Sequence, residues 1–544
     1  MLYAFDHAHD RPPRELTGLL GGKGAGLAEM TTVLGLPVPP GFTVAVPVCR
    51  GYREEGWPAG LDAALDAHCR ALERRMGRCF GGPADPLLLA VRSGAPRSMP
   101  GMLDTVLNLG LNPATVEGLA DASGDHRFAW ESYRRFLTMY ATTVLGLPAE
   151  TVRSDGRDGH GAAGTASVDE LRAQVAAILR AVAGAGLSVP DDPMAQLRGA
   201  VEAVFRSWDS ARARAYRAHE GIADDLGTAV NVQAMVFGNL GDESGTGVVF
   251  TRDPSTGAAL PYGDFLPRAQ GEEVVAGTAH TLTIDTMAER LPGAYAELRH
   301  HLRRLEIHYR DLCDVEFTVE RGRLWILQTR VGQRGAVAAV RTAVEMVDDP
   351  GIALTREEAV ARVSPELRCR ARAEVLASAR HGSASSVPLA VGEGASPGRV
   401  TGAAVLDADA AAEREGPVIL VRPETSPEDV HGMSVSVGIL TSTGGLVSHA
   451  AVVARGWGIP AVVGAGSLVI GPVDVRRPDG TLLFAAGDEI TIDGTTGEAW
   501  LGRPDETVDV SQTDDDILTR HLPQLAELER WAAEVGSPAA LQGA

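Results

Sequence analysis

The sequence predicts a multidomain α/β (α+β) protein, and three observations favour that class. The length of 544 residues exceeds what one hydrophobic core usually supports, so several domains are expected. Helical periodicity dominates residues 61–78, 168–185 and 193–208. Residues 229–237 instead alternate apolar and polar side chains, and short apolar runs alternate with turns across residues 387–503, both of which indicate strands.

Composition narrows the class of protein further. The formal charge, 50 − 71 = −21, argues against general nucleic-acid binding, although a local basic pocket could still hold phosphate. We find no run of 18 apolar residues and no secretory signal at the start, so no membrane segment is expected. The cysteines are scattered and odd in number, typical of reduced thiols in a cytoplasmic protein. They are Cys49, Cys69, Cys79, Cys313 and Cys369.

Two N-terminal segments could bind phosphate. The glycine cluster at residues 21–24 precedes a helical pattern, so its backbone N–H groups and Lys23 could hold a polyphosphate. The spacing is not that of Walker A, and a turn with a solvated lysine fits equally well. Arg92 follows a buried-strand candidate and enters a Gly/Pro/Ser loop, where its guanidinium could match phosphate oxygens. A surface loop with solvated arginines is the alternative.

The middle of the chain changes from helices to strands. Residues 127–205 are mostly helical and predict a subdomain inserted in the nucleotide-binding part. Alternation later places Asp314 and Glu316 on one face of a strand, and a hairpin over residues 320–323 would bring Gln328 near them. Carboxylate and amide oxygens suit Mg²⁺. The pattern alone, however, favours a half-exposed hairpin with a wet polar face.

A histidine loop dominates the C-terminal part. Gly444 and Gly445 permit a tight turn, Ser448 can cap a helix, and His449 falls at the first turn of that helix. The positive helix end disfavours a protonated imidazole, which leaves a ring nitrogen free to attack phosphorus. A helix start with an incidental histidine is the alternative. An acidic segment and one amphipathic helix, through Leu518 to Trp531, close the chain.

The longer strings around these residues resemble a known family. The string from Gly444 through Arg455 to Gly456 is similar to the phosphohistidine motif of pyruvate phosphate dikinases, phosphoenolpyruvate synthases and rifampin phosphotransferases. The opening Gly-Gly-Lys-Gly-Ala and the later Ser-Met-Pro-Gly-Met resemble the dikinases in particular. Val447 departs from the threonine usual in dikinases, so regulation through that threonine is not expected here.

The resemblance implies a fold and its domains. It implies an ATP-grasp nucleotide-binding domain over residues 1–340, with the helical subdomain at about 113–208. A helical linker over 341–386 would lead to a swivelling β/α phosphohistidine domain over 387–505. Residues 506–544 would be a linker helix and tail.

The same resemblance implies site residues. His449 would be the phosphorylated nucleophile, supported by Gly444, Gly445, Ser448 and Arg455 of its loop. Glu316 and Gln328 would bind Mg²⁺. The positions implied for ATP and its phosphates are Lys23, Arg92, Gly101, Asp314, Glu316, Gln328 and Arg330.

The implied reaction transfers the β-phosphoryl group of ATP to His449 and the γ-phosphoryl group to inorganic phosphate. A PEP- and pyruvate-binding barrel is absent from the sequence, so the expectation is a split dikinase that serves a separate barrel protein and is a monomer when alone. Transfer to another small molecule, as in the synthases or rifampin phosphotransferases, is an alternative. A non-catalytic nucleotide sensor or phosphocarrier is another.

Overall fold

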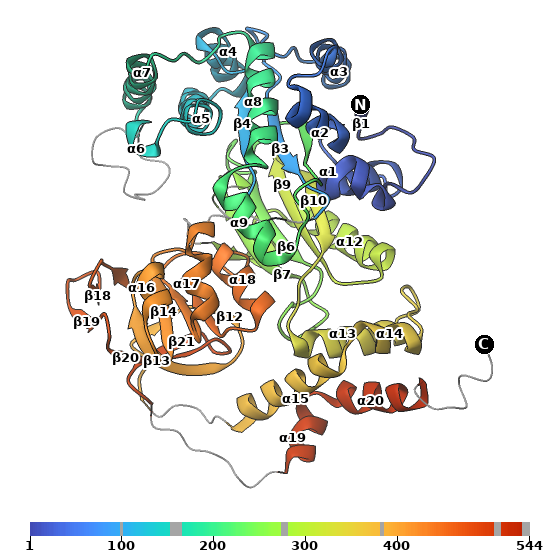
Figure 1. Cartoon of the computed structure of the whole chain (residues 1–544), viewed down its shortest axis with the longest axis vertical. Coiled ribbons are helices and arrows are strands. Elements are labelled where there is room, and N and C mark those ends of the chain that lie inside the picture. The colour runs from blue at the N-terminus through green and yellow to red at the C-terminus, as the bar shows by residue number, and fades with distance from the viewer. Residues whose placement is uncertain are drawn as a thin grey trace. The chain divides into compact units, whose positions relative to one another are not determined.

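The computed structural model describes residues 1–97, 99, 102–152, 166–271, 273, 281–380, 386–504 and 513–535. The chain divides into two compact units. The first comprises Met1–Asp242 with Thr318–Arg321 and Trp325–Thr329. The second comprises Glu243–Phe317, Gly322–Leu324 and Arg330–Ala544. Several sheets with helices packed on them confirm the predicted mixed α/β, multidomain class (Figure 1).

The first unit is built on an antiparallel five-stranded sheet. In sheet order its strands are β1 (Leu2–Ala4), β2 (Gly41–Val44), β5 (Ala229–Ala234), β3 (Leu89–Gly94) and β4 (Thr105–Leu109). All six side chains of the central strand β5 are buried, the polar Asn231 and Gln233 included, although an alternating sequence is typical of a strand with one solvated face. The strand therefore offers a rigid base for side chains on both of its faces.

Helices cover this sheet and extend beyond it (Figure 1). They are α1 (Thr17–Thr32), α2 (Val46–Glu55), α3 (Leu61–Met76), α4 (Pro113–Ser123), α5 (His126–Met139), η2 (Tyr140–Val144), α6 (Ala149–Val152), α7 (Val168–Gly184), α8 (Pro193–Ser207) and α9 (Ala211–Glu220), after the short η1 (Pro13–Glu15). The predicted helices at 61–78, 168–185 and 193–208 are confirmed. A capping box between Ser167 and Glu170 explains why α7 starts where it does.

A second five-stranded sheet follows in the order β10-β9-β6-β7-β8. Its strands are β6 (Gly245–Phe250), β7 (Tyr262–Pro267), β8 (Leu282–Thr283), β9 (Cys313–Glu320) and β10 (Arg323–Val331), with helices α11 (Thr286–Arg290) and α12 (Pro292–Tyr309). The predicted hairpin is confirmed: Arg321 and Gly322 have φ of 48° and 77°, as a tight two-residue turn requires. Sequence reasoning missed β7.

An eight-stranded sheet forms the core of the histidine-bearing part. In sheet order the strands are β11 (Ala390–Val391), β21 (Glu498–Leu501), β20 (Glu489–Asp493), β13 (Arg399–Val405), β14 (Val418–Arg422), β15 (Gly438–Thr441), β16 (Ala461–Val463) and β12 (Glu393–Ser396). Helices α16 (Ala408–Glu413), η3 (Pro427–Asp429), α17 (Val430–Val435) and α18 (His449–Trp457) join its strands. A small sheet of β17 (Val469–Ile470), β18 (Asp474–Arg476) and β19 (Leu482–Ala485) is attached.

Strands β13 to β16 run parallel, so each connection between them must cross over the sheet. Helix α18 makes the crossover from β15 to β16 and buries Ala450, Ala451 and Ala454 against the sheet. This packing fixes the start of α18 at the end of β15, which is where the histidine lies.

The segments before and after this sheet meet in one helical layer. Helices α13 (Ala336–Asp348), α14 (Arg356–Arg362) and α15 (Pro365–Arg380) share an apolar core with α19 (Asp514–His521) and α20 (Pro523–Val535). The prediction of a single C-terminal helix is wrong. Leu522 has φ −148° and ends α19, and Pro523, which lacks an N–H, starts α20.

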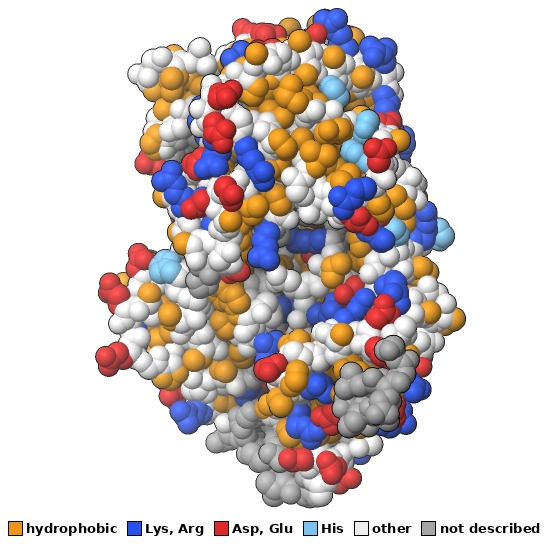
Figure 2. Space-filling view, turned by 45° about the vertical axis from the view of Figure 1, so that its right-hand side comes forward, with side chains coloured by type: hydrophobic (Ala, Val, Ile, Leu, Met, Phe, Trp, Pro, Cys, Tyr) orange, Lys and Arg blue, Asp and Glu red, His pale blue; other side chains and the backbone are white. Residues whose placement is uncertain are grey.

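The charges of the chain are mixed over its surface. On the face shown in Figure 2, basic and acidic side chains are interspersed among apolar ones, so the acidic excess is not gathered into one patch there. Among the described helices, none combines the length and the apolar character needed to cross a membrane.

Candidate functional site

The glycine turn, residues 21–24, lies on the end of strand β3. Gly21 interrupts α1 with φ 69° and ψ 165°, so a new helical turn begins at Gly22 and contains Lys23. The Gly22 N–H donates to the Ala95 carbonyl at 2.9 Å. A Cβ at position 21 would lie 1.6 Å from the Gly94 carbonyl oxygen, so this approach requires glycine. The prediction that the glycine cluster precedes a helix is right only for the turns after Gly21, because α1 already begins at Thr17 and is kinked at Gly21.

Arg92 lies close to this turn in the same unit. It is on β3, in register with Asn231 of β5. Gly94 lies two residues further along the strand, and a Cβ there would be 3.5 Å from the Lys23 Cβ. The structure thus brings Lys23 and Arg92 to the same end of the sheet. Gly101, predicted beside them, lies outside the described residues.

A buried ion pair joins β9 and β10. Arg330 Nε donates to Asp314 Oδ2 at 2.6 Å, and the Asp314 side chain is 6% exposed. Burial raises the pKa of Asp314 to about 6, with Arg330 opposing the rise and Glu316 adding to it. The Asp314 carboxylate in turn raises the pKa of Arg330. Glu316 lies on the same face of β9 and is half-buried. The predicted solvated face is wrong for Asp314, because this carboxylate is buried against Arg330.

The side-chain amide oxygen of Gln328 is a buried hydrogen-bond acceptor. This Oε1 atom has no hydrogen-bond partner among the described residues, and the residue is 9% exposed. The neighbouring Thr329 carbonyl is 3.4 Å from where a Cβ on Gly26 would lie, so this stretch of β10 runs beside α1. Buried polar groups are usually satisfied, so an orphaned amide oxygen indicates a missing ligand or donor.

The oxygens at this end of the hairpin suit a hard cation. The described residues contain no group of three or more His, Cys, Asp or Glu side chains able to hold a metal. Mg²⁺ takes one or two carboxylates and fills its other positions with water and substrate phosphates. Glu316 has a half-buried carboxylate, and Gln328 has an amide oxygen without a partner among the described residues, so each side chain by itself offers an oxygen of the type that Mg²⁺ takes.

His449 is the first residue of α18. Its Nδ1 lies 2.9 Å from the Thr425 hydroxyl oxygen. Burial lowers the pKa of His449, with Asp429 opposing, so the imidazole is neutral near pH 7. A neutral ring whose Nδ1–H donates to Thr425 carries its lone pair on Nε2, and that atom can act as a nucleophile. Sequence reasoning missed Thr425, which lies 24 residues away.

Hydrogen bonds from the side chains of Ser448 and Arg455 hold the loop before His449. Gly444 has φ 88°, as a tight turn requires. Ser448 occupies the N-cap position, but the prediction that its side chain caps the helix is wrong. Its hydroxyl instead donates to the Gly445 carbonyl at 2.8 Å, which tightens the turn. Arg455 is buried and donates to the carbonyls of Leu446 (2.6 Å) and Ala395 (2.8 Å), joining the loop to β12.

Asp264 on β7 is a second residue that the sequence did not reveal. Its carboxylate accepts from the Val447 N–H at 2.9 Å and also from the Leu446 N–H and the Thr281 hydroxyl. Burial raises the pKa of Asp264 to about 6. A Cβ on Gly445 would lie 2.4 Å from this carboxylate, so Gly445 is needed for close approach rather than for backbone conformation.

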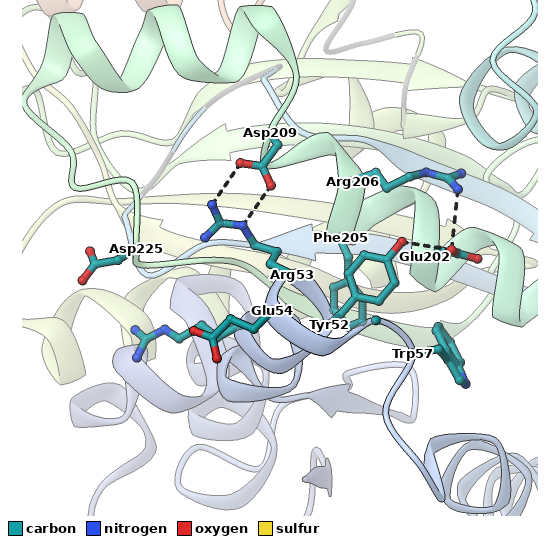
Figure 3. Close-up of a pocket in the computed structure, with 11 residues that line it drawn as sticks. Tyr52, Arg53, Glu54, Trp57, Glu202, Phe205, Arg206, Asp209 and Asp225 are labelled. Carbon is teal, nitrogen blue, oxygen red and sulfur yellow. Dashed lines mark hydrogen bonds and ion pairs between the residues drawn. The ribbon is translucent and has the colours of Figure 1, made fainter.

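A pocket of about 1060 Å³ lies elsewhere in the first unit, between α2 and α8 (Figure 3). Its arginines have partners: Arg53 binds Asp209 through two nitrogens, and Arg206 lies 3.7 Å from Glu202. Tyr52 donates to the same glutamate at 2.9 Å. The described lining residues include none of the predicted phosphate-binding side chains. The candidate site is therefore defined by the side chains above and not by this pocket.

Two family matches cover the parts just described. Residues 54–292 match the pyruvate phosphate dikinase AMP/ATP-binding domain. Residues 414–497 match the mobile domain of PEP-utilising enzymes and include His449. The chain is thus similar in one part to an ATP-binding domain and in another part to a mobile domain of PEP-utilising enzymes.

The chain is 45% identical over 533 residues to pyruvate, phosphate dikinase of Rhizobium meliloti (strain 1021), covering 92% of this chain and 58% of that protein. It is 46% identical over 503 residues to pyruvate, phosphate dikinase 2 of Oryza sativa subsp. japonica (90% and 56%). The Clostridium symbiosum pyruvate, phosphate dikinase is 45% identical over 507 residues (90% and 56%). These matches support a relationship of this chain to the pyruvate phosphate dikinase family. The chain spans somewhat over half the length of these relatives.

Proposed function

We propose that the chain is an ATP-dependent phosphotransferase that phosphorylates its own His449 at Nε2. The observation that carries the proposal is the hydrogen bond between His449 Nδ1 and the Thr425 hydroxyl, which orients the ring and, with Nδ1–H as the donor, leaves Nε2 as the nucleophile. The lowered pKa of His449 supports it, because a protonated ring has no lone pair to offer. The start of α18 would also stabilise the phosphate once it is attached.

The nucleotide would be held in an ATP-grasp domain over residues 1–340, with its helical subdomain at about 113–208. The histidine would be carried on a swivelling domain over 387–505, between the linker at 341–386 and the C-terminal segment 506–544. Both assignments rest on the two family matches and on the sheets described above. Swivelling of a carrier domain is a hinge motion.

Phosphate charge would be neutralised by basic side chains. We assign this role to Lys23 on the glycine turn, to Arg92 and to Arg330, with the loop at Gly101 over the phosphates. Phosphoryl transfer depends mostly on positioning and charge neutralisation, so these contacts would supply much of the catalysis. Asp314 would hold Arg330 in place through the buried ion pair.

Mg²⁺, when bound by Glu316 and Gln328, would supply positive charge to the ATP phosphates. In the reaction, Nε2 of His449 forms a bond to the β-phosphorus and AMP leaves. Inorganic phosphate then takes the γ-phosphoryl group, giving pyrophosphate and phosphohistidine. The phosphoryl group would finally pass to pyruvate on a PEP- and pyruvate-binding barrel.

The direct test is labelling of the protein with Mg²⁺ and ATP that carries ³²P at the β-phosphate, with and without inorganic phosphate. We expect acid-labile label on the protein and phosphate-dependent formation of pyrophosphate. His449→Ala should carry no label, and His431→Ala, an exposed histidine of the same part of the chain, should label as the parent does.

Label that persists in His449→Ala would overturn the assignment of the nucleophile. Folded parent protein that binds ATP but takes no label would show that the chain is not a phosphotransferase by itself. Adding a purified PEP- and pyruvate-binding barrel and pyruvate to labelled protein tests the acceptor, because loss of label should then match formation of PEP.

A further inference from the structure

Asn231 lies at the centre of a row of polar side chains on the sheet of the first unit. Thr43 of β2 and Arg92 of β3 are its cross-strand partners on either side. Directly paired residues of antiparallel strands point to the same face, so all three side chains share one face. Asn231 is therefore the immediate neighbour of the arginine assigned to phosphate.

The amide of Asn231 also contacts the backbone of two glycines. A Cβ on Gly24 of the glycine turn would lie 2.8 Å from Asn231 Oδ1. A Cβ on Gly94 of β3 would lie 2.5 Å from Asn231 Nδ2 and 3.5 Å from the Lys23 Cβ. The Asn231 side chain therefore packs against both the helix that carries Lys23 and the strand that carries Arg92, beside the direct hydrogen bond from Gly22 to Ala95.

One hydrogen bond sets the orientation of the Asn231 amide, and burial of its unpaired Nδ2 lowers the stability of the folded state. The Thr43 hydroxyl donates to Asn231 Oδ1 at 2.8 Å, so Nδ2 must face Gly94. Asn231 is 1% exposed, and its Nδ2 has no hydrogen-bond partner among the described residues. A leucine would fill similar space without leaving a donor unpaired. Such a local cost is typical of functional positions.

We propose that Asn231 is a positioning residue for phosphate recognition, holding the Lys23 turn at a set distance from Arg92 with Thr43 fixing its amide. This inference rests on the proposed function, in that Lys23 and Arg92 are the phosphate contacts. It predicts that Asn231 matters for the β- and γ-phosphates of ATP and not for the rest of the nucleotide.

The test compares ATP and AMP affinity by calorimetry, in a His449→Ala background so that ATP is not consumed. For Asn231→Leu we expect ATP to bind about tenfold more weakly and AMP within twofold of the parent. Thr43→Val should weaken ATP binding about threefold, and Thr43→Ser should restore it. Because Thr43 acts through Asn231, the double variant Thr43→Val/Asn231→Leu should bind ATP no more weakly than Asn231→Leu.

Gln233→Leu is the matched control. Gln233 is a buried amide on the same strand, but its Nε2 donates to the Pro39 carbonyl at 3.1 Å and not to the glycine turn. We expect its ATP to AMP affinity ratio to equal that of the parent. Equal weakening of ATP and AMP in Asn231→Leu would instead indicate a general structural defect and overturn the proposal.

Two further outcomes separate this inference from the proposed function. Parent protein that labels at His449, with Asn231→Leu binding ATP as tightly as the background, overturns the positioning role alone. Parent protein that binds ATP without labelling overturns the phosphotransferase function, and the affinity ratios still decide the role of Asn231. If Asn231→Leu does not fold, Thr43→Val and Thr43→Ser decide it, and equal ATP affinity in these two overturns the proposal.

Discussion

The histidine loop differs from the end of the first unit that carries Lys23, Arg92 and Gln328, which we call the proposed phosphate end, in how buried polar groups are paired. Around the loop, Arg455, Asp264 and Thr425 provide partners for backbone and ring atoms. At the proposed phosphate end, Asn231 Nδ2 and Gln328 Oε1 are buried without partners among the described residues. A nucleophile must be held in one orientation before reaction, whereas a ligand site needs donors and acceptors left for the ligand. The following predictions sharpen this difference, beginning with the largest effect.

Arg455→Met should destabilise the second unit most, by about 3–5 kcal/mol, because it removes a buried charge and leaves two carbonyls and the Asp264 carboxylate without it. Differential scanning calorimetry of the full chain measures the effect. Arg476→Met, at an exposed ion pair, should leave the unfolding temperature unchanged. A variant Arg455→Met as stable as the parent would show that the loop is not held from within.

Gln328→Leu should change the free energy of unfolding in the opposite direction from Arg455→Met. Removing an unsatisfied buried acceptor should raise the free energy of unfolding by about 1–3 kcal/mol without ligand, while ATP-dependent labelling falls at least tenfold. Gln233→Leu should instead destabilise, because that amide is satisfied by Pro39. Chemical unfolding and labelling of the two variants test this, and destabilisation of both would contradict the idea of an acceptor kept for a ligand.

Thr425→Val should slow labelling of His449 about fivefold, since one hydrogen bond is worth about 1 kcal/mol and here orients the ring. Thr425→Ser should retain the parent rate. The lowered pKa of His449 predicts that the parent rate falls to half of its plateau at a pH below the ordinary histidine value of 6.5. A midpoint above 6.5 would contradict a neutral, buried ring.

Asp264→Asn should have the smallest effect on stability. The effect should appear mainly in how the unfolding temperature depends on pH. The folded pKa of Asp264 is raised from 3.8 to about 6, so its contribution to stability is present below the unfolded value and is lost as pH rises through about 6. The variant keeps an acceptor for Val447 and should show a smaller loss of unfolding temperature over this window. Asp409→Asn, at an exposed site, should keep the parent slope.

The local sequence determined the elements and their ends. Periodicity located the helices and hairpin, and glycines located the turns at 21–24 and 444. The string around His449 pointed to the histidine that we propose as the nucleophile. Sequence reasoning misassigned the Ser448 hydroxyl and the break at Leu522. Both depend on a choice between nearby hydrogen-bond partners or turns, and periodicity carries no information about that choice.

Only the tertiary structure decided which distant residues serve these elements. Asp264 meets Val447 across 183 residues, and Thr43 meets Asn231 across 188. In the sequence, Asn231 is one polar position in an alternating strand, and Asp264 lies in a strand with no clear alternation. Their roles follow from sheet register and from glycines that permit close approach, and register is set by packing of the whole sheet.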